Sequence, residues 1–409
     1  MQGILSLRPL WVLMATVFVD MVGFAMVLPL LPFYAKDFGA SPTVIGLLIA
    51  AYSVAQLLSA PLWGRMSDRY GRRPLIIAGL IAAGCAYVVF GLAQSLWMLF
   101  LCRLIQGAGG GTTGVVQAYV ADLVPPQDRA RALGWITAAT SAGVMLGPAI
   151  GSLAIHWNHS APGFLAALLC AANVISARRW LTEPPVPARP KRPQGSSRQM
   201  FYSVIRHPAA PFALPIWIYA LGMMAFMAMN AILALFLSDR FGVTAKSIGW
   251  FYAYVGGISI VMRAILLGPA VRRFGEGGVV RLGIASLAIG LLSIPLTTSV
   301  WILGLAVLFI PVGTALLFPA TSSMVSALAP KDSTGQALGV QQSFGGVARL
   351  VGPIWAGSLF EIGYRVPFWT GAGLMALLLV PSLSLSRRIE RSALVPIPVT
   401  PAESTTPSS

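Results

Sequence analysis

Charged residues and cysteines are scarce in this chain. Of its 409 residues, 10% are charged and 56% are hydrophobic, whereas roughly 25% of an average soluble domain is charged. The three cysteines, Cys85, Cys102 and Cys170, show no CxxC spacing, so neither a disulfide framework nor a thiolate metal site is expected. This composition excludes an ordinary soluble protein.

Basic residues are in excess, with 28 Lys and Arg against 12 Asp and Glu. A nucleic-acid-binding protein gathers its basic residues on one soluble face. Here they lie instead at the ends of apolar segments. No nucleic-acid partner is therefore expected.

Long apolar segments run through most of the chain. A bilayer core about 30 Å thick needs about 20 apolar residues per helix, because backbone polar groups cannot stay unpaired in hydrocarbon. Cutting the sequence at charge and turn clusters predicts twelve spans, over 9–34, 43–64, 74–93, 96–122, 130–156, 161–177, 211–238, 247–268, 278–298, 301–329, 335–361 and 364–386. The predicted fold class is an all-α membrane protein with twelve transmembrane helices in two six-helix, pseudo-symmetric bundles.

The distribution of Lys and Arg predicts the orientation, since cytoplasmic loops carry the excess. With both termini cytoplasmic, only Lys36, Arg240, Lys246 and Arg365 fall in outer loops. The expected division is a first bundle over 1–181, a Pro- and Arg-rich cytoplasmic linker over 182–210, a second bundle over 211–386 and a disordered tail over 387–409.

An internal repeat supports two related bundles. The segment APLWGRMSDRYGRRPLIIAG (60–79) aligns without gaps on AILLGPAVRRFGEGGVVRLG (264–283), and Gly147-Pro148 recurs as Gly352-Pro353. The two copies are offset by 204 or 205 positions. Such a repeat predicts a binding site at the interface of the halves, near the bilayer midplane.

The most specific motif is GRMSDRYGRR, between the second and third spans. It resembles the loop signature of the major facilitator superfamily, and the chain as a whole is similar to its twelve-span drug/proton antiporters, which include the tetracycline exporters. The resemblance implies a conformational latch between the halves, made by Gly64, Asp68, Arg69, Gly71, Arg72 and Arg73 with Asp122. The alternative is a solvated basic turn that only fixes topology. The second copy has Arg272 in place of Asp68.

Two further segments carry the same resemblance. RLIQGAGGG places Arg103 within the fourth span, where a charge costs about 2.5–3.5 kcal/mol and normally faces a cavity or a partner. Snorkelling to the outer surface is the alternative.

The fifth span carries an antiporter-type packing motif with small residues four apart, Gly143, Gly147, Pro148 and Gly151, followed by Ser152 where the family usually has glycine. In the family this motif is associated with exporters, and generic tight packing is the alternative.

Asp20 is the acidic residue that lies deep in a predicted span, in a segment similar to the first span of tetracycline exporters. Burial disfavours the charged form of a carboxyl, and a nearby Arg103 would favour it again. Proton coupling is therefore expected at Asp20 and Arg103, with proton and substrate competing for Asp20. A structural ion pair is the alternative.

Polar, Met and aromatic residues within the spans are the candidates for a substrate cavity. They are Gln56, Gln117, Met223, Phe226, Met227, Asn230, Gln341 and Arg349. Thioethers adapt to varied ligand shapes, although helix packing or interhelical hydrogen bonds also account for such residues. Three arginines within spans, Arg103, Arg263 and Arg349, against one acid favour anionic or zwitterionic substrates. In the tetracycline exporters the second half contributes titratable groups to the pathway, whereas here no His or carboxylate lies mid-span after Asp20. Tetracycline itself is therefore not expected.

The predicted function is a proton-coupled exporter of small amphiphilic drugs or metabolites, working by alternating access. Uptake symport, or transport of lipids or organic anions by the same fold, is the alternative, and a non-transporting receptor is the alternative of another class. The chain lacks a nucleophile–base pair and a metal-ligand set in its spans, so no enzyme activity, cofactor or metal is expected. The resemblance implies a bacterial cytoplasmic membrane. We expect the protein to work as a monomer.

Overall fold

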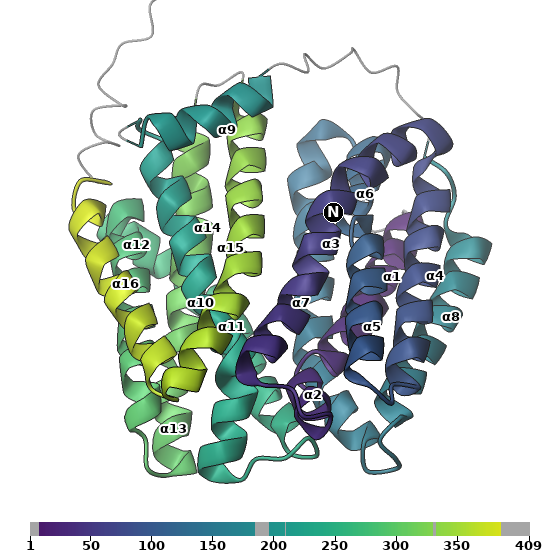
Figure 1. Cartoon of the computed structure of the whole chain (residues 1–409). Coiled ribbons are helices and arrows are strands. Elements are labelled where there is room, and N and C mark those ends of the chain that lie inside the picture. Colours follow the sequence, from purple (N-terminus) through teal and green to yellow (C-terminus); the bar gives the residue numbers. More distant parts are fainter. Residues whose placement is uncertain (1–7, 185–195, 209, 330–332, 386–409) are drawn as a thin grey trace, which may run out of the picture.

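The computed structural model describes residues 8–184, 196–208, 210–329 and 333–385. It is all-helical over these residues, and its helices form two bundles that stand side by side (Figure 1). The predicted tail over 387–409 lies outside the described residues.

The first bundle is formed by helices that begin close to the predicted boundaries. They are α1 (Arg8–Val27), α2 (Leu31–Asp37), α3 (Pro42–Tyr70), α4 (Arg72–Gly91), α5 (Leu96–Gly109), α6 (Thr112–Leu123), α7 (Arg129–Ala154) and α8 (Ala161–Trp180), with a short 3₁₀ turn, η1 (Pro126–Asp128), before α7. The predicted first span is broken around Pro29, and the predicted fourth span around Gly110 and Gly111. Helix α1 packs on α7 and α8, and α4 packs on α8.

The second bundle repeats this arrangement. Its helices are α10 (Ala213–Phe241), α11 (Ile248–Ile265), α12 (Leu267–Ser293), α13 (Val300–Val307), α14 (Phe309–Leu328), α15 (Thr334–Ile362) and α16 (Val366–Ser382), with η2 (Ile294–Leu296) after α12. Helix α12 contains a sharp turn at Gly275, whose φ is +65°. Gly71, at the same position of the repeat, has a φ of +98°. Glycine suits both turns because it has no Cβ to clash at positive φ.

Counting the interrupted helices α1–α2, α5–α6 and α13–α14 once each gives twelve spans in the described part of the chain. In that part, nine helical segments are long and apolar enough to cross a membrane by length and composition alone. The others are the broken α5–α6, the short α16, and α15, which carries glutamines and an arginine in its middle.

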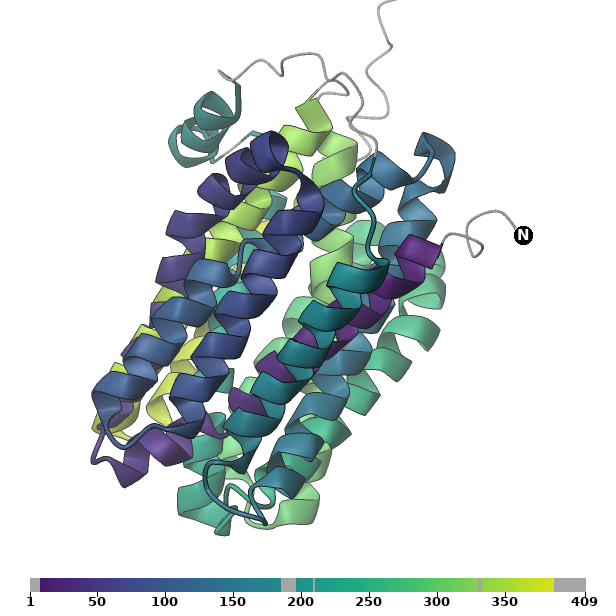
Figure 2. The ribbon, with the colours of Figure 1, turned by 90° about the vertical axis from the view of Figure 1, so that its right-hand side faces the viewer.

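The linker between the bundles contains a helix that the sequence reading did not include, α9 (Ser196–Arg206). Met200, Phe201 and Val204 pack against the second bundle near Phe344. Figure 2 shows α9 at one end of the long helices, and we call this end of the molecule the linker end. The Gly64–Arg73 turn also lies at the linker end, whereas α2 and α13 lie at the opposite end (Figure 1).

The two bundles meet closely at the opposite end. A Cβ added to Gly46 of α3 would lie 2.3 Å from the Pro353 carbonyl oxygen of α15, and one added to Gly249 of α11 would lie 2.0 Å from that of Pro148 in α7. Pro148 and Pro353 are equivalent in the repeat, so the two backbone contacts are related by the pseudo-symmetry. Side chains at these glycines would force the bundles apart.

Polar contacts fasten the same end. The Lys36 ammonium lies 2.7 Å from the Asp239 carboxylate, and the Thr43 N–H donates to Glu361 at 3.1 Å. The buried Ser152 hydroxyl donates to the Ala245 carbonyl at 2.9 Å and accepts from the Gly249 N–H at 2.8 Å. At the linker end, by contrast, a Cβ added to Gly64 or Gly335 would meet no described atom within 4 Å. The structure is therefore closed at the opposite end.

Candidate functional site

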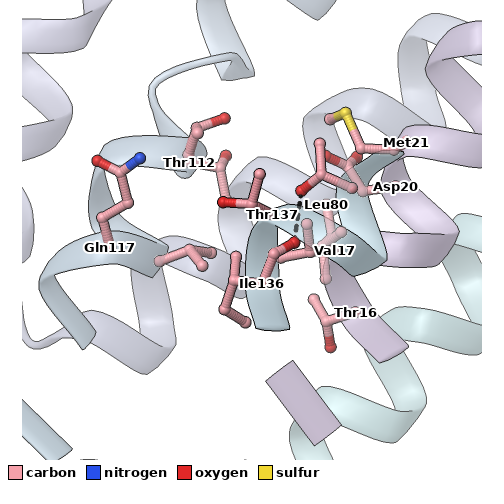
Figure 3. Close-up of a pocket in the computed structure, with 12 residues that line it drawn as sticks. Thr16, Val17, Asp20, Met21, Leu80, Thr112, Gln117, Ile136 and Thr137 are labelled. Carbon is pink, nitrogen blue, oxygen red and sulfur yellow. Dashed lines mark hydrogen bonds between the residues drawn. The ribbon is translucent and has the colours of Figure 1, made fainter. Parts of the chain in front are cut away.

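Asp20 lines a hollow of about 200 Å³ inside the first bundle. Figure 3 shows its lining side chains, which come from α1, α4, α6 and α7: Thr16, Val17, Asp20, Met21, Leu80, Thr112, Thr113, Val116, Gln117, Ile136, Thr137 and Thr140. Asp20 is the charged residue among them. A hollow of this size suits several water molecules or one group of a ligand, since a water occupies about 30 Å³ in the liquid.

Threonine hydroxyls make most of the polar lining. Helices α1 and α7 begin at the linker end and α6 ends there. Thr16, Gln117 and Thr137 therefore lie nearer the linker end than Asp20 does. The hydroxyls of Thr112, Thr137 and Thr140 donate to nearby backbone carbonyls, and their remaining lone pairs can accept hydrogen bonds in the hollow.

A second, smaller hollow adjoins Asp20 and is lined by aromatic and amide groups. Phe24, Tyr52, Tyr87 and Gln106 border it together with Asp20. Its volume is about 30 Å³, which is room for about one water molecule. Asp20 thus borders both hollows.

Arg103 is enclosed within the first bundle, with 1% of its surface exposed. Its guanidinium donates to the Gln106 side-chain oxygen and lies over the Tyr52 ring, 4.6 Å from the ring centroid. This contact is a cation–π interaction. The guanidinium therefore has partners inside the bundle, and the snorkelling alternative is wrong.

Direct pairing of Arg103 with Asp20 is not seen: within the described residues, no ion pair of 4.0 Å or less joins them. Polar groups connect their surroundings instead. The Gln106 amide donates to the Tyr87 hydroxyl at 3.0 Å, and Tyr87 and Gln106 both border the small hollow beside Asp20. Arg103 thus positions the side chains around the carboxyl and does not neutralise it by contact.

The small residues of α7 set the position of α1, the helix that carries Asp20. A Cβ added at Gly143, Gly147 or Gly151 would lie 2.6–2.7 Å from the carbonyl oxygens of Phe18, Val22 and Met26, respectively. Three successive turns of α1 therefore rest on the bare backbone of α7, as small residues four apart permit. The next small position, Ser152, contacts the second bundle.

Three predicted cavity residues of the second bundle, Met223, Phe226 and Met227, lie in one apolar cluster. Tyr219, Met223 and Ala348 form a small buried cluster, with Met224, Phe226, Met227 and Phe318 packed against it. Arg349, next to Ala348 on α15, is half-buried. Asn230 donates back to the Phe226 carbonyl of its own helix at 2.8 Å. Arg263, expected inside, is exposed.

The predicted glutamines are used in different ways. The Gln56 amide nitrogen donates to the Tyr52 hydroxyl and to the Gly110 carbonyl, both at 3.1 Å, so it joins α3 to the break between α5 and α6. Gln117 lines the large hollow. Gln341 is fully buried, and neither polar atom of its amide has a hydrogen-bond partner in the described structure. Unpaired buried amides are rare and indicate water or a ligand.

Arg72 is the centre of the turn motif at the linker end. It is 5% exposed, and its guanidinium lies 2.6 Å from Asp68 and 3.0 Å from Asp122, the latter at the end of α6. It also donates to the Ser67 hydroxyl. These contacts join α3, α4 and α6 within the first bundle.

Glu183 lies in the segment predicted as the linker, but it makes contacts with this turn. Its carboxylate accepts hydrogen bonds from the backbone N–H groups of Arg72 and Arg73, next to Gly71, and so caps the start of α4. The Arg73 guanidinium donates to the Arg178 carbonyl. Arg69 is exposed and lies over the Tyr70 ring, 5.3 Å from the centroid.

Several residues around Asp20 were not singled out from the sequence. Tyr52, Tyr87 and Gln106 were missed, as were the threonines of the large hollow. Gln106 lies in the motif that contains Arg103, which was a usable signal. Among the described residues, no group of three or more His, Cys, Asp or Glu is placed to hold a metal ion.

Sequence similarity identifies the protein family of this chain. The sequence model of the Major Facilitator Superfamily matches residues 13–313 and 264–406. The chain belongs to the Major Facilitator Superfamily. This is a family of secondary transporters and not of enzymes, so the protein is an integral membrane transporter of small molecules.

Relatives named for drug resistance cover most of the chain. It is 29% identical to the tetracycline resistance protein, class C, of Escherichia coli over 90% of this chain and 92% of the relative. It is also 29% identical to multidrug resistance protein 1 of Bacillus subtilis (strain 168), over 88% and 92%, respectively. The family and relationship predicted from the motifs are confirmed.

Solved transporters share the fold at low identity. The nucleoside transporter NupG matches with a TM-score of 0.74 and 14% identity over 92% of this chain and 99% of that one. The human organic anion transporter MFSD10 matches with a TM-score of 0.66 and 23% identity over 92% and 99%. The predicted fold class is confirmed.

Proposed function

We propose that the protein is a proton-coupled exporter of small amphiphilic drugs or metabolites. The observation that carries this proposal is Asp20, a carboxyl deep in a membrane span that borders a threonine-lined hollow reaching toward the linker end. A group so placed can take up a proton from one compartment and release it to the other. Moving a proton across the membrane field gains about 2.3 kcal/mol per 100 mV, which supplies the work of export.

The proposed conformational cycle starts from the conformer that is closed at the end opposite the linker. With the linker and both termini in the cytoplasm of a bacterial cell, the conformer described above faces the cytoplasm. The contacts of Ser152, Gly46 and Gly249 would then close the outer side. Rocking of the two bundles would break them and expose Asp20 to the outer solution. The protein is proposed to do this as a monomer, with each half acting as one body.

The turn at Arg72 is proposed to latch the halves when the linker end closes. In this conformer Arg72 holds Asp68 and Asp122 within the first bundle, while Asp68 and Arg69 remain exposed. Exposed charges of both signs can then meet the second bundle. The repeat has Arg272 at the position of Asp68, so the second turn carries a basic residue where the first turn carries an acidic one.

Export is favoured over uptake by two observations. The Gly143, Gly147 and Gly151 stripe, which resembles the motif of antiporters, is in backbone contact with α1. The relatives are named tetracycline and multidrug resistance proteins. A membrane transporter can confer resistance by removing a compound from the cell, so the same direction is proposed here.

The test is substrate-dependent proton movement in proteoliposomes, with Asp20→Asn as the variant. The amide is nearly isosteric with the carboxyl and cannot exchange a proton. We expect Asp20→Asn to abolish proton-coupled transport, while Asp20→Glu retains part of it. Asp37→Asn is the matched control, because Asp37 is an exposed acid at the far end of the same span.

Undiminished proton movement by Asp20→Asn would refute the coupling role. Saturable counterflow without any pH change in the wild type would show facilitated diffusion instead. Size-exclusion profiles of the purified variants check that the loss of coupling is not a loss of folding.

A further inference from the structure

Arg349 is a mid-span cation without a bound partner in the described part of the chain. It lies near the middle of α15 and is half-buried. Its guanidinium makes no hydrogen bond or ion pair with any residue in the described ranges, although a guanidinium has five N–H donors. A charge at this depth normally pairs with another group or faces a water-filled cavity. Arg103, by contrast, is fully enclosed and bound to Gln106.

The surroundings of Arg349 place it at the seam between the two bundles. The Ser53 hydroxyl of α3 donates to the Arg349 carbonyl at 3.4 Å. Tyr219 of α10 packs with Ala348, the residue before Arg349. Tyr52, the residue before Ser53 on α3, borders the small hollow beside Asp20. Helix α3 therefore links the surroundings of Arg349, in the second bundle, to those of Asp20, in the first.

An apolar cluster of side chains adjoins Arg349. Tyr219 and Met223 pack with Ala348, the residue before Arg349, and Phe226, Met227 and Phe318 extend this wall. Phe318 meets the Tyr219 and Phe226 rings edge-on, with centroids 5.4 and 6.1 Å apart. Aromatic and thioether side chains accept apolar bodies of varied shape. The wall suits an apolar body whose charged group reaches the guanidinium.

The exchange of substrate for proton adds a second requirement. A proton and a substrate compete for Asp20 only if the substrate presents a cationic or hydrogen-donating group there. A purely anionic compound would be repelled by the ionised carboxyl and would favour its protonated form, which is the linkage of a symporter. Arg349 and Asp20 together therefore select for opposite charges on one molecule.

We infer that the substrates are zwitterionic amphiphiles. The anionic group is held by Arg349, the apolar body lies on the wall of Tyr219, Met223, Phe226, Met227 and Phe318, and a basic group competes with the proton at Asp20. This assignment rests on the proposed function, and it makes Arg349 a specificity-determining residue of the same site.

The test is equilibrium binding of four fluorescent compounds on one scaffold to the purified full-length protein in detergent. Nα-dansyl-lysine carries a carboxylate and a free ε-amine separated by a methylene chain. Its methyl ester is cationic, its Nε-acetyl derivative is anionic, and the doubly blocked compound is neutral. We expect the wild type to bind the zwitterion at least about tenfold more tightly than the ester, as one charge-assisted hydrogen-bonded contact provides.

The variants separate the two charges. Arg349→Gln should remove the preference for the zwitterion over the ester and leave binding of the ester unchanged, and Arg349→Lys should retain part of the preference. Asp20→Asn should weaken binding of the zwitterion and the ester and spare the anion. Arg365→Gln is the matched control, since Arg365 is exposed at the closed end and stacks on Tyr364 and Trp369, and it should bind all four compounds as the wild type does.

Equal binding of zwitterion and ester by the wild type would overturn the assignment, as would failure to bind any of the four compounds. Equal weakening of zwitterion and ester by Arg349→Gln would also overturn it. Binding needs no proton gradient, so the assay is independent of coupling. If the compounds bind as expected but no proton movement is seen, the proposed function alone is refuted. If Arg349→Gln exports the ester with proton coupling at the wild-type rate and still prefers the zwitterion in binding, this inference alone is refuted.

Discussion

Ser152 is predicted to hold the transporter closed at the end opposite the linker. Its hydroxyl is fully buried and bridges the Ala245 carbonyl and the Gly249 N–H of the second bundle. When the bundles separate at this end, water can bond to all three groups. Ser152→Ala therefore removes two hydrogen bonds from the closed state and nothing comparable from the open state.

The size of the effect follows from these two bonds. Each buried hydrogen bond contributes about 0.5–1.5 kcal/mol net, so losing both should shift the equilibrium by about 1–3 kcal/mol. That corresponds to roughly a 5- to 150-fold increase in the ratio of molecules open at this end to molecules closed at it. Alanine keeps the Cβ and the helix propensity of α7, which confines the change to the hydroxyl.

Spin–spin distance measurements between labels at positions 37 and 246 report this equilibrium, because the two positions flank the closed end from different bundles. The labels are placed in a variant whose native cysteines are replaced. Ser358→Ala is the control: its hydroxyl lies on α15 at the same end but bonds to Ile354 of its own helix at 3.0 Å. A distance distribution for Ser152→Ala that matches the wild type, or an equal shift in Ser358→Ala, would refute the reasoning.

Two further predictions concern stability. Gly147→Val should lower the free energy of unfolding by about 1–3 kcal/mol, as overpacking does, because the Cβ of the valine would lie 2.7 Å from the Val22 carbonyl oxygen. Thermal melting measures this loss. Gly114→Ala should show no such loss, because a Cβ at position 114 meets no described atom within 4 Å. Asp122→Asn should cost about 3–5 kcal/mol by leaving the enclosed Arg72 charge under-compensated, whereas Asp68→Asn, whose side chain is 60% exposed, should cost about 0–1 kcal/mol. Equal melting temperatures for the Asp122 and Asp68 variants would contradict the assignment of the buried pair.

Hydropathy and the repeat were enough to predict the spans, and the turn motif was enough to predict the family. Spans of the expected length follow from the bilayer thickness, and the turn at Gly71 recurs at Gly275 because both copies need positive φ at the same place. Breaks within spans were harder to predict. Pro29 and the three glycines after Ala108 interrupt α1–α2 and α5–α6, but membrane helices tolerate the same residues elsewhere, as Pro61 in α3 shows.

The partners of individual side chains depend on how the helices are rotated and tilted, which hydropathy does not specify. The depth of Arg103 was readable from its position, but its contact with the Tyr52 ring required α3 and α5 to be placed side by side. The lining of the large hollow by Thr112 and Thr137 likewise depends on which faces of α6 and α7 turn toward α1. Short polar side chains carry no periodic signal that is strong enough to reveal this.

The repeat also shows which features belong to the shared scaffold. Backbone contacts at the closed end are preserved in both halves, since Pro148 meets Gly249 as Pro353 meets Gly46. The hydroxyl bridge beside them is not preserved. With an offset of 204 or 205 positions, Ser152 corresponds to Ala356 or Gly357, and neither of these residues has a hydroxyl.

The two charges assigned to substrate recognition are not duplicated either. At the same offsets, Asp20 corresponds to Met224 or Ala225 in the second half, and Arg349 corresponds to Met145 or Val144 in the first. Each half therefore contributes one charge of its own sign. A symmetric scaffold can rock between two states, and in the proposed mechanism a carboxyl from one half and a guanidinium from the other would let it distinguish one end of a substrate from the other.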